Sequence, residues 1–130
     1  MTGNSAALDT STAIAVLNGD AGIAEWLAGF DRIFLPVVVV AELKLGALKS
    51  KHVSQNLARV QAIVRVCGVL DIRMSTTDQY ARTQLALVRA GTPIPVNDLW
   101  IASICLDYDL PLATADAHFS TVQGLMLLRR

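Results

Sequence analysis

Four acidic residues occupy positions from which an α/β chain could bring their carboxylates together. They are Asp9, Glu42, Asp98 and Asp116. Each lies just after a predicted strand or early in a predicted helix, and in a parallel sheet ligands bind beyond these carboxyl ends of the strands. Converging carboxylates repel one another unless they are protonated or a cation neutralises them. Oxygen ligands with room for water suit Mg²⁺ or Mn²⁺, and such a site could catalyse phosphoryl chemistry with water that the metal activates.

Asp98 has the most distinctive surroundings of the four acids. Pro93 and Pro95 fix an extended approach, and Asn97 and Asp98 then head an apolar run that continues to Leu106. This run is too apolar for a surface helix and predicts a buried helix with Asp98 in its first turn. The helix N-terminus favours an ionised carboxylate, but a buried one also needs a cation or hydrogen-bond donors. A simpler role for Asp98, as a helix cap alone, stays open.

Short apolar segments alternate with helical patterns along the chain. Strands are predicted at residues 6–8, 32–35, 69–72, 110–113 and 125–128. Helices are predicted at residues 13–17, 21–28, 36–48, 57–67, 75–90 and 96–108. This alternation predicts an α/β fold, a three-layer α/β/α domain with a parallel sheet of about five strands, and residues 1–130 as a single domain. In the helix that ends at residue 90, Ala81, Leu85 and Val88 are expected to face inward.

The composition indicates a folded protein with one core. Hydrophobic residues make up 53% of the 130-residue chain and charged residues 17%, which excludes a disordered chain. Cys67 and Cys105 lack CxxC spacing and are interpreted as reduced core residues of a cytoplasmic protein. No basic leader precedes an apolar stretch, and the longest plain apolar run, residues 35–41, is too short to span a membrane.

Basic residues gather in one part of the chain, although its eleven basic and eleven acidic residues balance to zero net charge. Every charge from Lys44 to Arg65 is positive. The residues are Lys44, Lys49, Lys51, Arg59 and Arg65. We interpret this stretch as a track for the RNA backbone beside the acidic site, although each residue alone could belong to a solvated helix face.

Four short motifs carry a resemblance to a known family. They are Leu8-Asp9-Thr10-Ser11, Glu42-Leu43-Lys44-Leu45-Gly46, Val96-Asn97-Asp98-Leu99-Trp100-Ile101-Ala102 and Thr114-Ala115-Asp116-Ala117-His118-Phe119. In order and spacing, over nearly the whole chain, they resemble the PIN-domain family and most of all its bacterial VapC toxins. The resemblance implies a PIN-like fold and a divalent-metal-dependent endoribonuclease, the toxin of a toxin–antitoxin pair that a small antitoxin partner usually neutralises.

The resemblance also assigns roles by position. It implies that the catalytic and metal-binding acids are Asp9, Glu42, Asp98 and Asp116. The supporting polar positions are matched by Thr10 or Ser11, Asn97 and Thr114. We expect Mg²⁺ or Mn²⁺ as the cofactor, a homodimer, and cleavage that leaves 5′-phosphate and 3′-hydroxyl ends. The residues expected to bind RNA are Lys44, Lys49 and Lys51.

Other function classes fit the sequence less well. A haloacid-dehalogenase-like phosphatase would need a second aspartate where Ser11 stands. A phospho-acceptor receiver module would need a lysine late in the chain, but none follows Lys51. A PIN scaffold that only binds a partner stays open, although all four acids are present. His118 could orient a phosphate or donate a proton, but we expect it to be an ordinary loop side chain, and we expect Asp107 to be solvated.

Overall fold

A computed structural model describes residues 4–130 of the chain. Five strands form one parallel sheet in the order β3-β2-β1-β4-β5. The strands are β1 (Ser5–Leu8), β2 (Arg32–Pro36), β3 (Gly68–Leu70), β4 (Leu112–Ala113) and β5 (Leu127–Leu128). The predicted parallel sheet of five strands is therefore confirmed, although β4 and β5 are shorter than the apolar runs that contain them.

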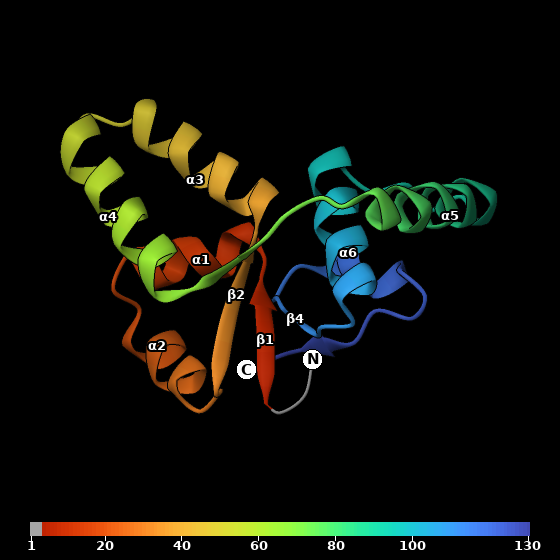
Figure 1. Ribbon diagram of the computed structural model, residues 1–130, viewed down its shortest axis with the longest axis horizontal. Helices are drawn as coiled ribbons and strands as arrows, with labels where there is room; N and C mark the ends of the chain where they lie inside the picture. The colour runs from red at the N-terminus through yellow and green to blue at the C-terminus, as the bar shows by residue number, and fades with distance from the viewer. Residues whose placement is uncertain (1–3) are drawn as a thin grey trace.

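Helices cover both faces of this sheet. They are α1 (Thr10–Leu17), α2 (Ala21–Ala28), α3 (Val37–Leu48), α4 (Val53–Val66), α5 (Met74–Ala90), α6 (Val96–Tyr108) and the 3₁₀ helix η1 (Ala117–Thr121). In Figure 1, α1, α2 and α4 lie on one side of the sheet, whereas α6 and α5 lie on the other. This arrangement is the predicted three-layer α/β/α fold. Among the helices of residues 4–130, none combines the length and apolar character that a membrane crossing requires.

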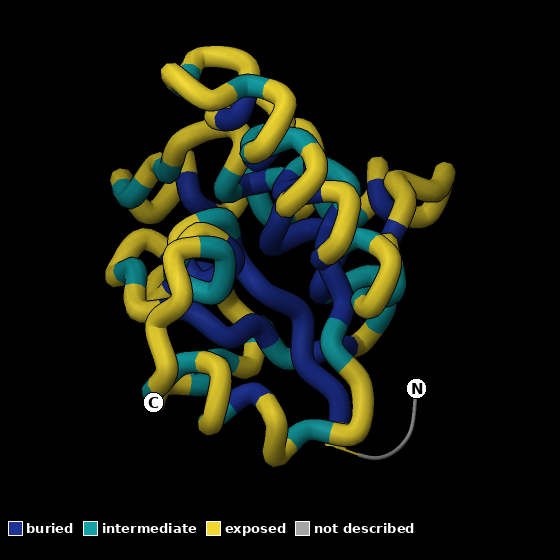
Figure 2. The backbone as a smooth tube through the Cα atoms, turned by 90° about the vertical axis from the view of Figure 1, so that its left-hand side faces the viewer, coloured by how far each residue is buried: buried dark blue, intermediate teal, exposed yellow. Residues whose placement is uncertain are grey.

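The core lies around β1 and α6. All four residues of β1 are buried, because β1 is the central strand and helices cover both of its faces. In α6, Leu99 and the run from Ile101 to Cys105 are buried, which confirms the predicted buried helix. Figure 2 shows this buried backbone, in dark blue, passing through the middle of the molecule. The core therefore fixes the strand ends and helix starts that carry the four acids.

The inward face predicted for α5 is wrong. Ala81 is exposed, and Leu85 and Val88 are 49% and 57% exposed. The buried residues of α5 are instead Thr76 and Leu87. The reason is that α5 packs on α6 and lies outside it, away from the sheet (Figure 1), so only one narrow face of α5 is covered.

Asp107 is also not solvated as expected, because its side chain is only 7% exposed. Its Oδ2 accepts hydrogen bonds from Arg73 Nε at 2.9 Å, from Thr76 Oγ1 at 2.8 Å and from Ser75 Oγ at 3.1 Å. Burial acts to raise the pKa of Asp107, but the three hydrogen bonds and the guanidinium charge together lower it. These contacts tie the start of α5 to the end of α6.

Candidate active site

Asp9 is the most buried of the four acids, at 3% exposed. It directly follows β1 and is the N-cap of α1, where its Oδ1 accepts a hydrogen bond from the Thr12 amide at 2.9 Å. The hydroxyl of Thr114 donates to its Oδ2. Each oxygen thus has a donor and still keeps a free lone pair. The acid expected to hold a metal is therefore also the N-cap of α1, which begins at Thr10, before the predicted helix start at residue 13.

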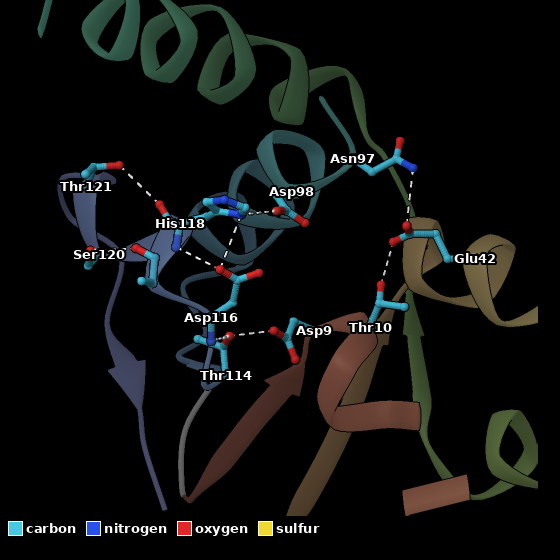
Figure 3. A network of polar contacts seen from close by, with 11 residues as sticks. Asp9, Thr10, Glu42, Asn97, Asp98, Thr114, Asp116, His118, Ser120 and Thr121 are labelled. Atoms are coloured by element: carbon cyan, nitrogen blue, oxygen red, sulfur yellow. Dashed lines mark hydrogen bonds and ion pairs between the residues drawn. The ribbon is translucent and has the colours of Figure 1, made fainter. Parts of the chain in front are cut away.

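The register of the sheet explains why Thr114 reaches Asp9. Leu8 of β1 pairs with Ala113 of β4, so the next residue on each strand emerges beside the other at the carboxyl edge. The Thr114 hydroxyl also accepts a hydrogen bond from the Asp116 amide at 2.9 Å. One buried hydroxyl therefore links the Asp9 carboxylate to the backbone of Asp116, as Figure 3 shows.

Asp98, Asp116 and His118 form a close group in which one ligand atom from each lies within 4.8 Å of the others. His118 Nδ1 lies 3.2 Å from Asp98 Oδ2 and 3.3 Å from Asp116 Oδ1 (Figure 3). Asp116 is the N-cap of η1, and its Oδ1 accepts a hydrogen bond from the His118 amide at 2.9 Å. His118 is thus not the ordinary loop side chain that we expected, although its place two residues after Asp116 was a usable signal.

Asp98 is not the N-cap of its helix. That position belongs to Pro95, and α6 has no side-chain cap. Burial is the main cause that raises the pKa of the Asp98 carboxyl; the hydrogen bond with His118 opposes it, and the negative charges of Asp116 and Glu42 raise it further. The protein therefore does not fully compensate the negative charge of the ionised Asp98 carboxylate. A bound cation would compensate it.

Glu42 lies apart from this group. Thr10 Oγ1 donates to its Oε1, and Asn97 Nδ2 donates to its Oε2 at 3.4 Å. In Figure 3, Glu42 is seen between Thr10 and Asn97, on the opposite side of the view from His118. Two of the expected supporting residues therefore hold Glu42, whereas Ser11 is exposed and Thr10 makes the contact instead.

The three lysines expected to bind RNA are all exposed. Lys44 lies on α3 two residues after Glu42. Lys49 and Lys51 lie at the other end of that helix and in the turn after it, about 10 Å or more from Glu42 along the helix axis. Along the chain only Lys44 is thus close to an acid, whereas Lys49 and Lys51 lie farther on, at the end of α3 and beyond it.

The donor set fits a divalent cation. The ion pairs formed within residues 4–130 join Arg73 to Asp107, Arg130 to Asp20, and His118 to Asp98 and Asp116. No lysine or arginine of that part of the chain thus neutralises the four acids. Hard carboxylate oxygens without a lysine or arginine partner suit Mg²⁺ or Mn²⁺.

Comparison with known proteins shows the family to which a chain with this fold and this cluster of acids belongs. Residues 6–125 match the model of the PIN domain, and the chain belongs to the PIN-domain family. It is homologous to the VapC ribonucleases: it is 32% identical over 120 residues to ribonuclease VapC5 of Mycobacterium tuberculosis, covering 90% of this chain and 87% of the relative. It is 30% identical over 104 residues to ribonuclease VapC2 of Rickettsia felis, covering 79% and 78%.

Solved structures of VapBC proteins have the same fold as this chain. VapBC2 from Rickettsia felis, bound to a DNA fragment from its promoter, superimposes with a TM-score of 0.87 at 26% identity, covering 96% of this chain and 98% of that one. VapBC-1 from nontypeable Haemophilus influenzae gives a TM-score of 0.89 at 26% identity, covering 96% and 97%. The resemblance to PIN domains is confirmed, and the phosphatase and receiver alternatives are excluded.

Proposed function

We propose that this chain is the ribonuclease toxin of a type II toxin–antitoxin system and that it cuts RNA internally with the help of a divalent metal. Its VapC relatives are ribonucleases. The observation that carries the proposal is the hydrogen-bonded series from Asp9 through Thr114 to Asp116, which shares its edge of the sheet with Asp98. We further propose that residues 1–130 act as one PIN domain, since the family match covers nearly all of them.

We assign the cation to Asp9, Asp98 and Asp116, with Mg²⁺ or Mn²⁺ as the ion. When bound, such an ion would lower the pKa of water and offset negative charge on the phosphodiester. Thr114 orients the carboxylate of Asp9 by donating to it, and this hydrogen bond adds no positive charge. Glu42, which Thr10 and Asn97 hold apart from the other acids, suits an acid that reaches the cation through water.

RNA and a protein inhibitor are the proposed partners. Lys44, Lys49 and Lys51 are exposed along one helix and its following turn, where they can contact successive phosphates. The Mycobacterium tuberculosis structure to which this chain is 29% identical is that of a member of the VapBC family of toxin–antitoxin systems. We therefore propose a small antitoxin as the protein partner, and a homodimer as the toxin's own assembly.

Incubation of the purified chain with RNA tests the function. Cleavage should stop in EDTA, return with Mg²⁺ or Mn²⁺, and leave 5′-phosphate and 3′-hydroxyl ends. Asp116→Asn should abolish it, whereas Asp78→Asn, an exposed acid of α5, should not. Cleavage that persists in EDTA and leaves cyclic phosphates would contradict the mechanism, and a folded chain that never cuts RNA would favour a scaffold that only binds.

A further inference from the structure

His118 is placed like a ligand of the proposed cation. Its Nδ1 lies 3.2 Å from an oxygen of Asp98 and 3.3 Å from an oxygen of Asp116. Adjacent ligands of an octahedral ion with bonds of about 2.1 Å lie about 3.0 Å from each other. The spacing between the nitrogen and each oxygen is thus already close to that of neighbouring ligands on one ion.

The backbone holds the imidazole in this place. The His118 amide donates to Asp116 Oδ1 at 2.9 Å, so the first turn of η1 is fixed to the same carboxylate that the ring contacts. The Phe119 side chain that follows is 1% exposed and anchors η1 in the core. The His118 side chain itself is 53% exposed, so it can turn by a small amount toward an incoming ion.

Nitrogen ligation has a consequence for the choice of metal. Mg²⁺ binds almost only oxygen and demands near-ideal octahedral geometry, whereas first-row transition ions accept imidazole nitrogen. Resting on the proposed metal-dependent function, we infer that His118 is a metal ligand through Nδ1 and that it gives the site a preference for Mn²⁺ over Mg²⁺.

The chain offers a matched control, because it contains only two histidines. His52 is exposed in the turn between α3 and α4 and is the N-cap residue of α4 without a side-chain hydrogen bond. His118→Ala and His52→Ala each remove one imidazole. Thermal melts in EDTA would check that both variants remain folded.

Mn²⁺ binding is measured by the electron paramagnetic resonance signal of the free ion, and Mg²⁺ binding by competition. We expect His118→Ala to weaken Mn²⁺ binding about tenfold while changing Mg²⁺ binding by less than about twofold. His52→Ala should change neither. Pulsed electron paramagnetic resonance of bound Mn²⁺ should show hyperfine coupling to a nitrogen nucleus in the wild type and in His52→Ala. This coupling should be lost in His118→Ala.

Two results would overturn this role of His118 alone. Unchanged Mn²⁺ affinity without nitrogen coupling would make His118 an ordinary surface side chain. Tighter binding of both ions in His118→Ala would mean that the imidazole competes with the cation for the carboxylates. Failure of the wild type to bind either ion would instead contradict the proposed function together with the inference, and Asp116→Asn, which should bind neither, sets that baseline.

Discussion

Replacing Asp98 by asparagine removes a negative charge from a site that several carboxylates share. A carboxylate oxygen of Asp98 and one of Asp116 lie within 4.8 Å of each other, and at that separation two unit charges repel by about 1 kcal/mol in a water-like medium and more in a drier one. Loss of the carboxylate from the first turn of α6 costs about 0.5 kcal/mol in the opposite direction. Asparagine keeps an oxygen that can accept a hydrogen bond from His118.

Burial and the neighbouring acids raise the pKa of Asp98, so the folded state holds this proton more tightly than the unfolded state. The ionised carboxylate therefore lowers stability at neutral pH. This destabilisation of the folded state disappears as the pH falls through the raised pKa toward the ordinary value of 3.8. Below that value the carboxyl is protonated in both the folded and the unfolded state. In EDTA at neutral pH we expect Asp98→Asn to be more stable than the wild type by about 0.5–1 kcal/mol, or about 2–4 °C in melting temperature.

Thermal melts in EDTA across the acidic and neutral range measure this gain, with Asp78→Asn as a control for loss of one exposed charge. The advantage of Asp98→Asn should shrink toward acidic pH. Mn²⁺ at about a hundred times its dissociation constant should stabilise the wild type by about 2.7 kcal/mol and the variant much less. A variant that is less stable than the wild type in EDTA at neutral pH would refute the reasoning, because the protein itself would then compensate the Asp98 charge.

Three further predictions concern binding, hydrogen bonding and reactivity. Replacing all three exposed lysines of α3 and its following turn by alanine should weaken RNA binding. The slope of log affinity against log salt should fall by somewhat under one unit for each lost phosphate contact. An unchanged slope would mean that these lysines do not bind RNA. The lysines are Lys44, Lys49 and Lys51. Thr114→Val should leave the buried Asp9 short of a donor and cost about 1–3 kcal/mol in denaturant unfolding, which Thr114→Ser should largely restore. Burial, followed by the charge of Asp9, raises the pKa of Cys105 to about 12, so mass spectrometry should find this thiol unmodified by alkylating reagents at neutral pH until the protein unfolds.

The parts of the site that follow from strand register could be predicted from sequence. Asp9 and Thr114 come next after two short apolar runs, and once those runs are neighbouring parallel strands the two side chains must meet. The start of α6 was equally clear, because two prolines and a long apolar run fix its position. These features depend on local patterns and on one rule of sheet geometry, so a single sequence carries enough information for them.

The orientation of side chains between elements could not be predicted in the same way. Glu42 meets Thr10 and Asn97 across sequence separations of 32 and 55 residues, and nothing local in the chain fixes those distances. The covered face of α5 likewise depends on where α6 lies, so an apolar stripe at Leu85 and Val88 gave the wrong direction. Patterns within one helix show that a face is apolar, but only its partner decides whether that face is covered.

The contrast between Asp107 and Asp98 shows how the structure separates a structural acid from one that suits a cation. Both lie near the ends of α6; the sequence predicted a site at Asp98, but it wrongly predicted that Asp107 would be solvated. Asp107 is paired with the Arg73 guanidinium, and its pKa is lowered, so its charge stabilises the fold. The pKa of Asp98 is raised, first by burial and then by the charges of Asp116 and Glu42, and no lysine or arginine of residues 4–130 pairs with it.

Neutral donors explain how such acids can still be held firmly. Thr114 fixes Asp9, and Thr10 and Asn97 fix Glu42, through hydroxyl and amide groups that carry no net charge. A lysine or arginine in the same places would hold the carboxylates equally well, but it would cancel the negative potential that attracts a divalent ion. Hydrogen bonds from neutral groups set the positions of the oxygens and leave their charge in place, so that charge remains available to a cation.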